Sequence, residues 1–361
     1  MPISAVDTIT LAFQHTKRQL FQPFRFWQWT RLAIVGLLAG EMGSGGGNVR
    51  LPSGFNIPQQ GGGSRHLLAQ NFPHIDPAIL GGLIAVLVVA AFVFIIVMLY
   101  ISSVMRFILF DSILAKQCHI RAGWSRRQGP GWKYFLWHLG FMFVSIVCMA
   151  ILVGIPALFA FARGWFSQPR AHLAPLIITG VIVFFVLMIF FIVAGVVQVL
   201  TKDFVVPQMA LEGIGPIEGW RRLWPMLEAE TGGYAVYIGM KIVMAIGAGI
   251  VIAIVTLILA LLIAVPVIAV IMAGVFAGKT VGLTWNVFTI TAAIVAGCVA
   301  FFIFFYIVAL ISVPAIVFFP AYSIYFFAPR YRPLSVLLYP PPSGTLPPPE
   351  PPGWTPTPQP A

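Results

Sequence analysis

Charged residues are scarce in this chain. Only 9% of its 361 residues are Asp, Glu, Lys or Arg, whereas 60% are hydrophobic. A soluble domain carries about 25% charged residues, so this composition excludes a water-soluble globular protein. Basic residues outnumber acidic ones by 21 to 10. Because no basic patch lies outside segments that flank apolar runs, we expect no nucleic-acid partner and assign the charge to loops that face anionic lipid headgroups.

Motifs that carry chemistry are also missing. The cysteines, Cys118, Cys148 and Cys298, form no Cys-x-x-Cys pair, so neither a disulfide framework nor a zinc site is predicted. The sequence contains no His-Glu-x-x-His and no Gly-x-Ser-x-Gly, so we expect no metal, no cofactor and no serine-hydrolase site. An acid–base pair on the outer face would have to use Glu41 and Asp76, which is a thin basis for an enzyme.

Long apolar runs dominate the chain instead. A bilayer core about 30 Å thick needs roughly 20 apolar residues in a helix. We predict an all-α fold, a polytopic transmembrane helical bundle of about six spans, near residues 24–42, 77–105, 134–162, 174–200, 234–273 and 286–327. The last two runs are too long for one straight crossing, and Pro266, Pro314 and Pro320 are the expected break points. Splitting both runs would give eight spans; we prefer six.

Residues 1–22 predict an amphipathic helix rather than a cleavable signal peptide. Ser4 and Asp7 have the spacing of a capping box. The apolar residues near one face are Val6, Ile9, Phe13 and Leu20. We therefore expect this helix to lie on the cytoplasmic membrane surface, in preference to packing on a soluble core.

Residues 23–332 form the predicted transmembrane domain. Its first span contains Arg25 and Arg31, which we expect to extend toward the headgroups. Two glycine runs within 41–76 predict a flexible outer loop. After it, residues 333–361 form a proline-rich tail that we expect to be disordered.

The distribution of Lys and Arg predicts the orientation. With six spans and both ends inside, the cytoplasmic segments hold 15 basic residues and the outer loops hold 5. By the positive-inside rule, we expect a multi-pass protein of the cell (inner or plasma) membrane with both termini in the cytoplasm.

Two of the predicted cytoplasmic loops share a pattern. The first reads Gly123-Trp124-Ser125-Arg126-Arg127 and the second Gly219-Trp220-Arg221-Arg222, 96 residues further on. Each follows an apolar span at a similar distance. We infer a possible duplicated unit of two spans and a loop, which would give a pseudo-symmetric bundle.

The second loop also carries a resemblance. It reads Asp203-Phe204-Val205-Val206-Pro207-Gln208-Met209, then Glu212-Gly213, then Trp220-Arg221-Arg222. This pattern resembles a family of uncharacterised prokaryotic six-span membrane proteins, similar to the membrane domain fused to some glycerophosphodiester phosphodiesterases. The resemblance extends from the N-terminal helix to about Arg332 and implies a fold and a location. It implies no activity, because the chain has no room for the phosphodiesterase barrel of about 250 residues.

The same loop can be interpreted physically. Pro207 is expected to break the helix that leaves the membrane, and Gly213 with Pro216 to form a turn. We expect Arg221 and Arg222 to meet lipid phosphates, Glu212 or Glu218.

Ionisable residues inside spans are functional candidates. We expect Lys241 to pair with Asp203 or Glu212, or to extend back to the surface. Asp111 occupies the place of Pro207 in the repeat and is expected to pair structurally with Arg106 or Lys202. The candidate functional or interfacial residues are Asp111, Trp124, Arg126, Lys202, Asp203, Pro207, Glu212, Trp220, Arg221, Arg222 and Lys241.

Three functions fit these observations. The first is a non-enzymatic module that interacts with membrane lipids or scaffolds an unidentified membrane-protein partner. The second is a small transporter or channel-like protein, and the third is an enzyme that acts on lipid headgroups through Asp203, Glu212 and Arg222. We expect those three residues to be structural or lipid-facing. Charged residues that converge on a cavity would favour the second or third function, and scattered surface pairs the first.

Overall fold

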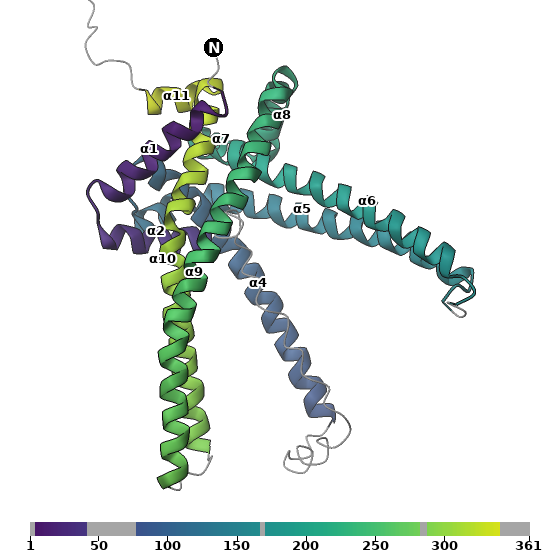
Figure 1. The fold of residues 1–361 in the computed structure, drawn as a ribbon. Helices are drawn as coiled ribbons and strands as arrows, with labels where there is room; N and C mark the ends of the chain where they lie inside the picture. Colours follow the sequence, from purple (N-terminus) through teal and green to yellow (C-terminus); the bar gives the residue numbers. More distant parts are fainter. Residues whose placement is uncertain (1–3, 42–76, 167–169, 282–286, 340–361) are drawn as a thin grey trace, which may run out of the picture.

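The computed structural model describes residues 4–41, 77–166, 170–281 and 287–339, and over these residues the chain is helical without any strand (Figure 1). The helices are α1 (Asp7–Phe21), α2 (Phe26–Leu38), α4 (Pro77–Leu114), α5 (Ile120–Ala162), α6 (Leu173–Leu200), α7 (Val206–Glu212), α8 (Pro216–Ala229), α9 (Thr231–Val281), α10 (Val287–Phe327) and α11 (Arg332–Leu338). The predicted all-α class is confirmed.

Five of these helices are long and apolar enough to cross a membrane. The segments are Gly81–Leu114, Ile120–Ala162, Leu173–Glu212, Thr231–Val265 and Ile294–Arg330. Their lengths, 34 to 43 residues, exceed the roughly 20 residues that a bilayer core requires. The chain is therefore an integral membrane protein by the length and composition of its helices.

The first predicted span takes a different form. Over 24–42 the chain forms α2, which has 13 residues and measures about 20 Å at 1.5 Å per residue. It is too short to cross the bilayer core and packs against α4 and α10. The described residues thus contain five candidate spans, not six.

The two longest apolar runs each form one uninterrupted helix. α9 has 51 residues, and α10 continues through Pro314 and Pro320 over 41 residues. These prolines do not divide α10, since neighbouring groups can compensate a lost helical hydrogen bond within a membrane. The eight-span alternative therefore does not describe this fold.

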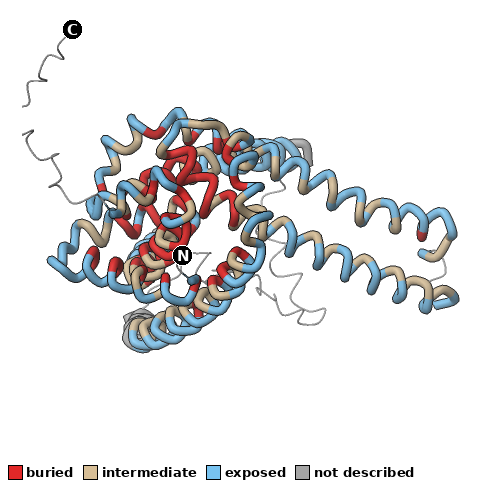
Figure 2. Tube along the Cα trace, turned by 90° about the horizontal axis from the view of Figure 1, so that it is seen from above, coloured by how far each residue is buried: buried red, intermediate tan, exposed pale blue. Residues whose placement is uncertain are grey.

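The packed core lies at one end of the molecule. Helices α1, α2, α7, α8 and α11 gather there with the adjoining ends of the long helices (Figure 1). From this core α4, the α5–α6 pair and the α9–α10 pair extend as arms. Buried residues concentrate in the core, while the arms are mostly exposed (Figure 2). The four segments predicted to be basic and cytoplasmic, within 17–31, 106–133, 202–222 and 330–332, share this core end, and the α5–α6 turn lies at the far end of its arm.

Helix α1 packs with its polar side inward. Asp7 N–H donates to Ser4 Oγ, as a capping box requires, but the Asp7 carboxylate accepts from the Ser4 hydroxyl and not from its backbone N–H, so only half of the predicted capping box forms. The residues buried by packing, chiefly against α10, are Thr8, Ala12, His15, Thr16, Gln19 and Leu20. Val6 and Phe13 remain 56% and 63% exposed, whereas Leu20 is buried and Ile9 half-buried, so the predicted apolar face is divided between the surface and the core.

The start of the proline-rich tail is ordered. Residues 332–338 form α11, and Leu334 is fully buried in the core, so the predicted disorder does not begin at residue 333. The rest of the predicted tail, 340–361, and the predicted glycine-rich loop lie outside the described residues.

Candidate functional site: a buried ion-pair network

A π-helical turn, Thr201–Val205, joins α6 to α7. Pro207 has no N–H and its ring crowds the carbonyl four residues earlier, so a regular α-helix is unfavourable here. The Val206 N–H bonds to Thr201 O, five residues back, which relieves the conflict. The helix is therefore widened by Pro207, not broken as predicted, and it ends only at Gly213, whose φ of 70° is left-handed.

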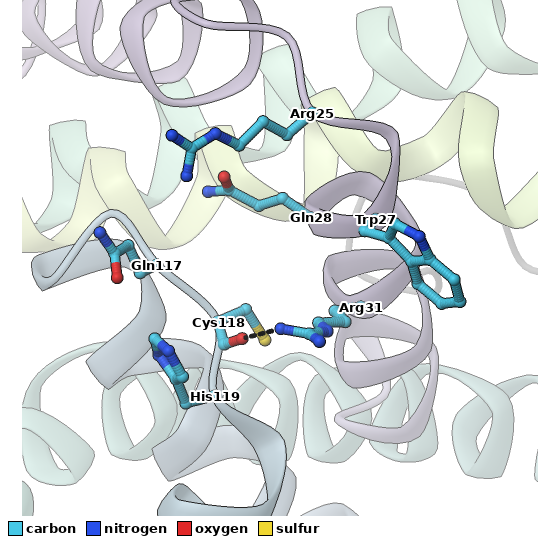
Figure 3. Close-up of a pocket in the computed structure, with 7 residues that line it drawn as sticks. All are labelled: Arg25, Trp27, Gln28, Arg31, Gln117, Cys118 and His119. Carbon is cyan, nitrogen blue, oxygen red and sulfur yellow. Dashed lines mark hydrogen bonds between the residues drawn. The ribbon is translucent and has the colours of Figure 1, made fainter.

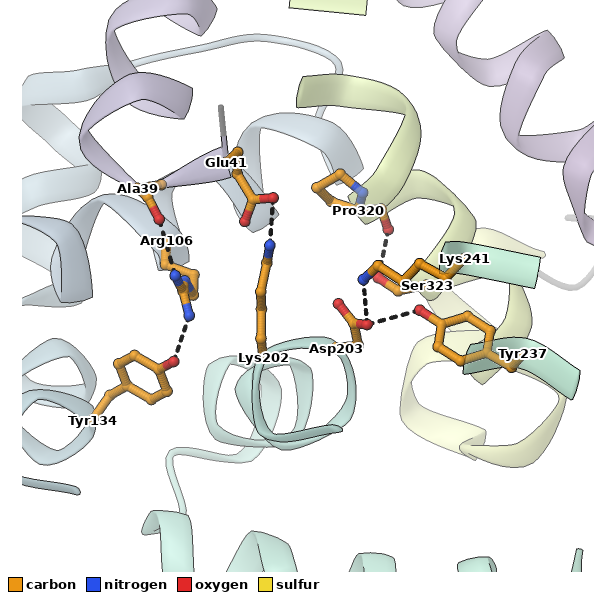
Figure 4. Close-up of polar contacts among 10 residues, drawn as sticks. All are labelled: Ala39, Glu41, Arg106, Tyr134, Lys202, Asp203, Tyr237, Lys241, Pro320 and Ser323. Atoms are coloured by element: carbon orange, nitrogen blue, oxygen red, sulfur yellow. Dashed lines mark hydrogen bonds and ion pairs between the residues drawn. The ribbon is translucent and has the colours of Figure 1, made fainter. Parts of the chain in front are cut away.

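The π-turn directs two adjacent charges to different partners. Lys202 Nζ lies 2.5 Å from a carboxylate oxygen of Glu41, which follows α2. Asp203 pairs with Lys241 of α9 and accepts a 2.9 Å hydrogen bond from Tyr237 Oη. Figure 4 shows the two pairs next to each other, with Lys202 and Glu41 to the left of Asp203 and Lys241. Widened helical turns of this kind are frequent at functional sites.

Arg106 of α4 lies beside these pairs. Its guanidinium donates to Tyr134 Oη of α5 and to Ala39 O, 2.9 Å away (Figure 4). Arg106, Glu41, Lys202 and Asp203 all line a cavity of about 30 Å³ that also contacts Pro207 and the end of α10. This volume accommodates about one or two water molecules and is too small for an organic substrate.

The network is buried but paired. Relative exposure is 4% for Glu41, 3% for Asp203 and 6% for Lys241. Burial opposes ionisation of Glu41, yet Lys202 and then Arg106 outweigh it and hold the pKa of this carboxyl below its usual range. Charges in such a setting are strongly coupled, because the low local dielectric magnifies each interaction.

The two repeat loops contain further ion pairs. Asp111 binds Arg127 through two hydrogen bonds of 2.6 Å, and Arg127 also donates to Ala210 O on α7. This pair joins the two repeat units. The prediction that Asp111 pairs with Arg106 or Lys202 was wrong, because Arg106 binds Tyr134 and Lys202 binds Glu41.

The repeat glycines occupy equivalent positions. A Cβ on Gly123 would lie 3.1 Å from Ile108, and one on Gly219 would lie 2.7 Å from Val205, in each case a residue of the preceding helical segment. Trp124 and Trp220 both pack against the core. This shared arrangement supports the inferred pseudo-repeat.

A third group of pairs lies nearer the surface. Glu212 accepts hydrogen bonds from Arg222 and Tyr331, and Arg222 also donates to Glu218. Arg221 is 80% exposed by side chain and lies 3.6 Å from Glu218. As predicted, these arginines meet Glu212 and Glu218. They do not join Asp203, whose partners are Lys241 and Tyr237, so the conceivable catalytic cluster is not assembled.

Comparison with known proteins places the chain in a family. DUF7544, a family of unknown function, matches residues 3–337. The chain belongs to this family. No curated protein and no solved structure matches it. These comparisons show no link between DUF7544 and the membrane domain of glycerophosphodiester phosphodiesterases, and the resemblance to that domain stays a prediction.

The predicted candidates of this DUF7544 member fall into distinct places. Lys202, Asp203, Pro207 and Lys241 surround the buried network, whereas Arg126 is exposed and has no ion pair among the described residues. Lys241 does not extend back to the surface. Within the described ranges no three His, Cys, Asp or Glu side chains form a possible metal site.

Sequence reasoning missed Glu41 as a site residue. It assigned this residue to the outer face, opposite Lys202, because 24–42 was counted as a full span. The structure brings Glu41 to Lys202 at the core end. The sequence did contain one feature that could have indicated Glu41, because it is an isolated acidic residue directly after an apolar run. Arg127, Arg106 and Tyr237 were also missed, because their partners are distant in the sequence.

Proposed function

We propose that this protein is a non-enzymatic, lipid-interacting membrane module. The observation that carries the proposal is a group of exposed apolar side chains on α1 and around the start of α2. Beside Val6 and Phe13, it exposes Phe21, Phe24, Phe26 and Trp27 by 54% to 74%. Aromatic side chains next to exposed Lys17 and Arg18 suit the layer where acyl chains meet headgroups.

The long helices support the same function. In the most apolar 18-residue stretches of α4, α5 and α6, no residue is buried within the protein. In the corresponding stretches of α9 and α10, only 6% and 11% of the residues are buried. In lipid this surface needs no protein cover, because acyl chains are as apolar as the side chains themselves. The sequence resemblance to a membrane domain that accompanies lipid-related enzymes also supports a lipid-facing role.

The arrangement of charges disfavours catalysis. A catalytic carboxylate needs a cleft that admits substrate, but the described network encloses only about 30 Å³. Its acids are engaged by Lys202, Lys241 and Tyr237. We therefore assign the buried network a structural role in holding the helix ends together.

Fluorescence quenching tests the lipid-facing surface. In a variant without the three native cysteines, a bimane probe is attached to Phe13→Cys or to the adjacent Gln14→Cys, and the protein is reconstituted in vesicles. We expect brominated acyl chains to quench the probe at position 13, and aqueous iodide to quench the probe at position 14, because the two side chains leave α1 in different directions. Stronger iodide quenching at position 13 than at 14, without quenching by brominated lipid, would reject the proposal.

A small ion-coupled transporter is the second candidate. Adjacent buried charges on a π-turn favour it, since ionisable residues inside a membrane frequently mark ion pathways. The test is a proteoliposome assay in which an imposed potential drives pH change in the lumen. Transport that Asp203→Asn abolishes, in protein that remains folded, would replace the first proposal with this one.

A further inference from the structure

A second polar cavity lies apart from the buried network, between the start of α2 and the segment that joins α4 to α5. Its volume is about 360 Å³, and it is lined by Arg25, Trp27, Gln28, Arg31, Gln117, Cys118 and His119. In Figure 3, Arg25 and Gln28 extend from the α2 side, whereas Gln117 and His119 belong to the opposite wall. We call this cavity the basic cleft.

The basic cleft contains positive charge without a counter-charge. No Asp or Glu lines it, and neither Arg25 nor Arg31 takes part in an ion pair among the described residues. Arg31 donates only to Cys118 O, at 3.3 Å. Its remaining N–H groups, and all those of Arg25, are available to a ligand. By contrast, each lysine and arginine of the buried network has a protein partner.

Two helix starts add to this positive potential. Arg25 is the N-cap residue of α2 and His119 is the N-cap residue of α5. Neither cap makes a side-chain hydrogen bond to its helix. The first-turn N–H groups of a helix have no helical acceptor and carry partial positive charge, so both walls of the basic cleft favour an anion.

We propose that the basic cleft binds a phosphate group. Guanidinium groups present paired N–H donors that match phosphate oxygens. The Gln117 amide adds a neutral donor, as does the second N–H of the Gln28 amide, which already donates to Lys116 O at 2.8 Å. The exposed aromatic residues around Arg25 place the cleft at headgroup level. The headgroup phosphate of an anionic phospholipid is the source we favour. That choice of source rests on the proposed lipid-interacting function, whereas phosphate recognition itself does not.

Ligand titration of the full-length protein in uncharged detergent tests this inference. The probes are dioctanoyl phosphatidylglycerol, dioctanoyl phosphatidylcholine and inorganic phosphate, and the readouts are the thermal unfolding midpoint and the lipid adducts seen by native mass spectrometry. The test variant is Arg25→Gln with Arg31→Gln. The matched control, Arg126→Gln with Arg332→Gln, removes the same charge from exposed positions outside the cleft.

We expect saturable binding of phosphatidylglycerol that is at least tenfold weaker in the test variant and unchanged in the control. Phosphatidylcholine should bind more weakly. Binding of inorganic phosphate without phosphatidylglycerol would support phosphate recognition and overturn the lipid source. Equal loss in both double variants, or no saturable binding of either anion, would overturn the inference.

A single substitution provides a second test in case the double variant misfolds. The Arg25 side chain has no hydrogen bond among the described residues, so Arg25→Gln alone should unfold at the wild-type temperature and still weaken anion binding. Arg25→Lys should restore part of the affinity, because it restores charge without the planar donor pair. The quenching experiment at Phe13 does not depend on the basic cleft. A negative result for phosphate binding can therefore be distinguished from a negative result for the proposed lipid-facing surface.

Discussion

Asp203 shows how strongly the surroundings of one residue determine its role. Sequence reasoning placed it on a membrane-surface loop with Glu212 and Arg222. In the structure it is buried within a helix and held by Lys241 and Tyr237. Its ion pair therefore lies in a low-dielectric setting, where loss of one partner leaves an uncompensated charge.

We predict that Lys241→Met destabilises the fold by about 3–5 kcal/mol, the usual cost of an unpaired buried charge. The measurement is thermal unfolding of the purified protein in detergent. The double variant Asp203→Asn with Lys241→Met should recover part of the loss, because no charge then remains unpaired. A Lys241→Met midpoint equal to wild type would show that the Asp203 carboxylate is solvated.

His15 provides a pH-dependent contact between α1 and the core. Its Nε2 faces two acceptors, Gln19 Oε1 and Ile113 O, both at 3.2 Å, so Nε2 carries the proton and Nδ1 accepts from Tyr325 Oη at 3.0 Å. Burial, together with the charges of Lys116 and Arg18, lowers the pKa of His15 below 6.5.

We predict that acidification weakens the fold through His15. The folded state takes up a proton at lower pH than the unfolded state, so this contribution is complete above pH 6.5 and is lost as the pH falls from there toward the folded-state pKa. Unfolding midpoints at pH 7.5 and 5.5 should differ more in the wild type than in His15→Gln. An identical pH dependence in both proteins would contradict the assignment.

Among the elements, the α6–π-turn–α7 segment organises the core end. Val205 of the π-turn lies beneath Gly219 of α8, and the Trp220 indole donates a 3.0 Å hydrogen bond to Thr201 Oγ1. The absence of a side chain at Gly219 is what lets α8 approach this closely. The corresponding contact of Gly123 with Ile108 fixes α5 against α4.

We predict that Gly219→Ala destabilises the protein by about 1–3 kcal/mol, the range for overpacking, because its Cβ would lie 2.7 Å from Val205 Cγ1. The matched control is Gly239→Ala in α9, where nothing lies within 4 Å; there we expect no loss, since alanine favours helix. Both are measured by thermal unfolding. Equal unfolding midpoints for the two variants would show that α8 can move away from Val205 without loss of stability.

At the scale of the whole molecule, the long helices leave one packed core and return to it. The ends that carry the basic segments lie at the core, and the α5–α6 turn lies at the far end of its arm (Figure 1). The gathering of basic segments at this end supports a core on the cytoplasmic side; the orientation stays a prediction.

We predict that Ser125 and Ala171 lie on opposite sides of the membrane. Single cysteines at these exposed positions, in a cysteine-free variant, are labelled with an impermeant maleimide on intact cells. Ala171→Cys should react before permeabilisation and Ser125→Cys only after it. Reaction of both from the same side would reject the topology.

The sequence alone determined the class of this protein and the approximate position of its spans. Runs of apolar residues longer than a bilayer core have no other stable surroundings, so length and composition sufficed for α4, α5, α6, α9 and α10. It also included the Asp203–Lys241 pair among the alternatives for Lys241, because few charges inside the spans were available to choose from.

Tertiary structure decided the rest. Glu41 and Lys202 are 161 residues apart, and no local pattern specifies that a short α2 brings them together. Likewise, the basic cleft depends on Arg25 and His119 meeting from separate helices. Such contacts follow from how helix ends pack, whereas membrane insertion requires only that each helix be apolar and satisfy its own backbone.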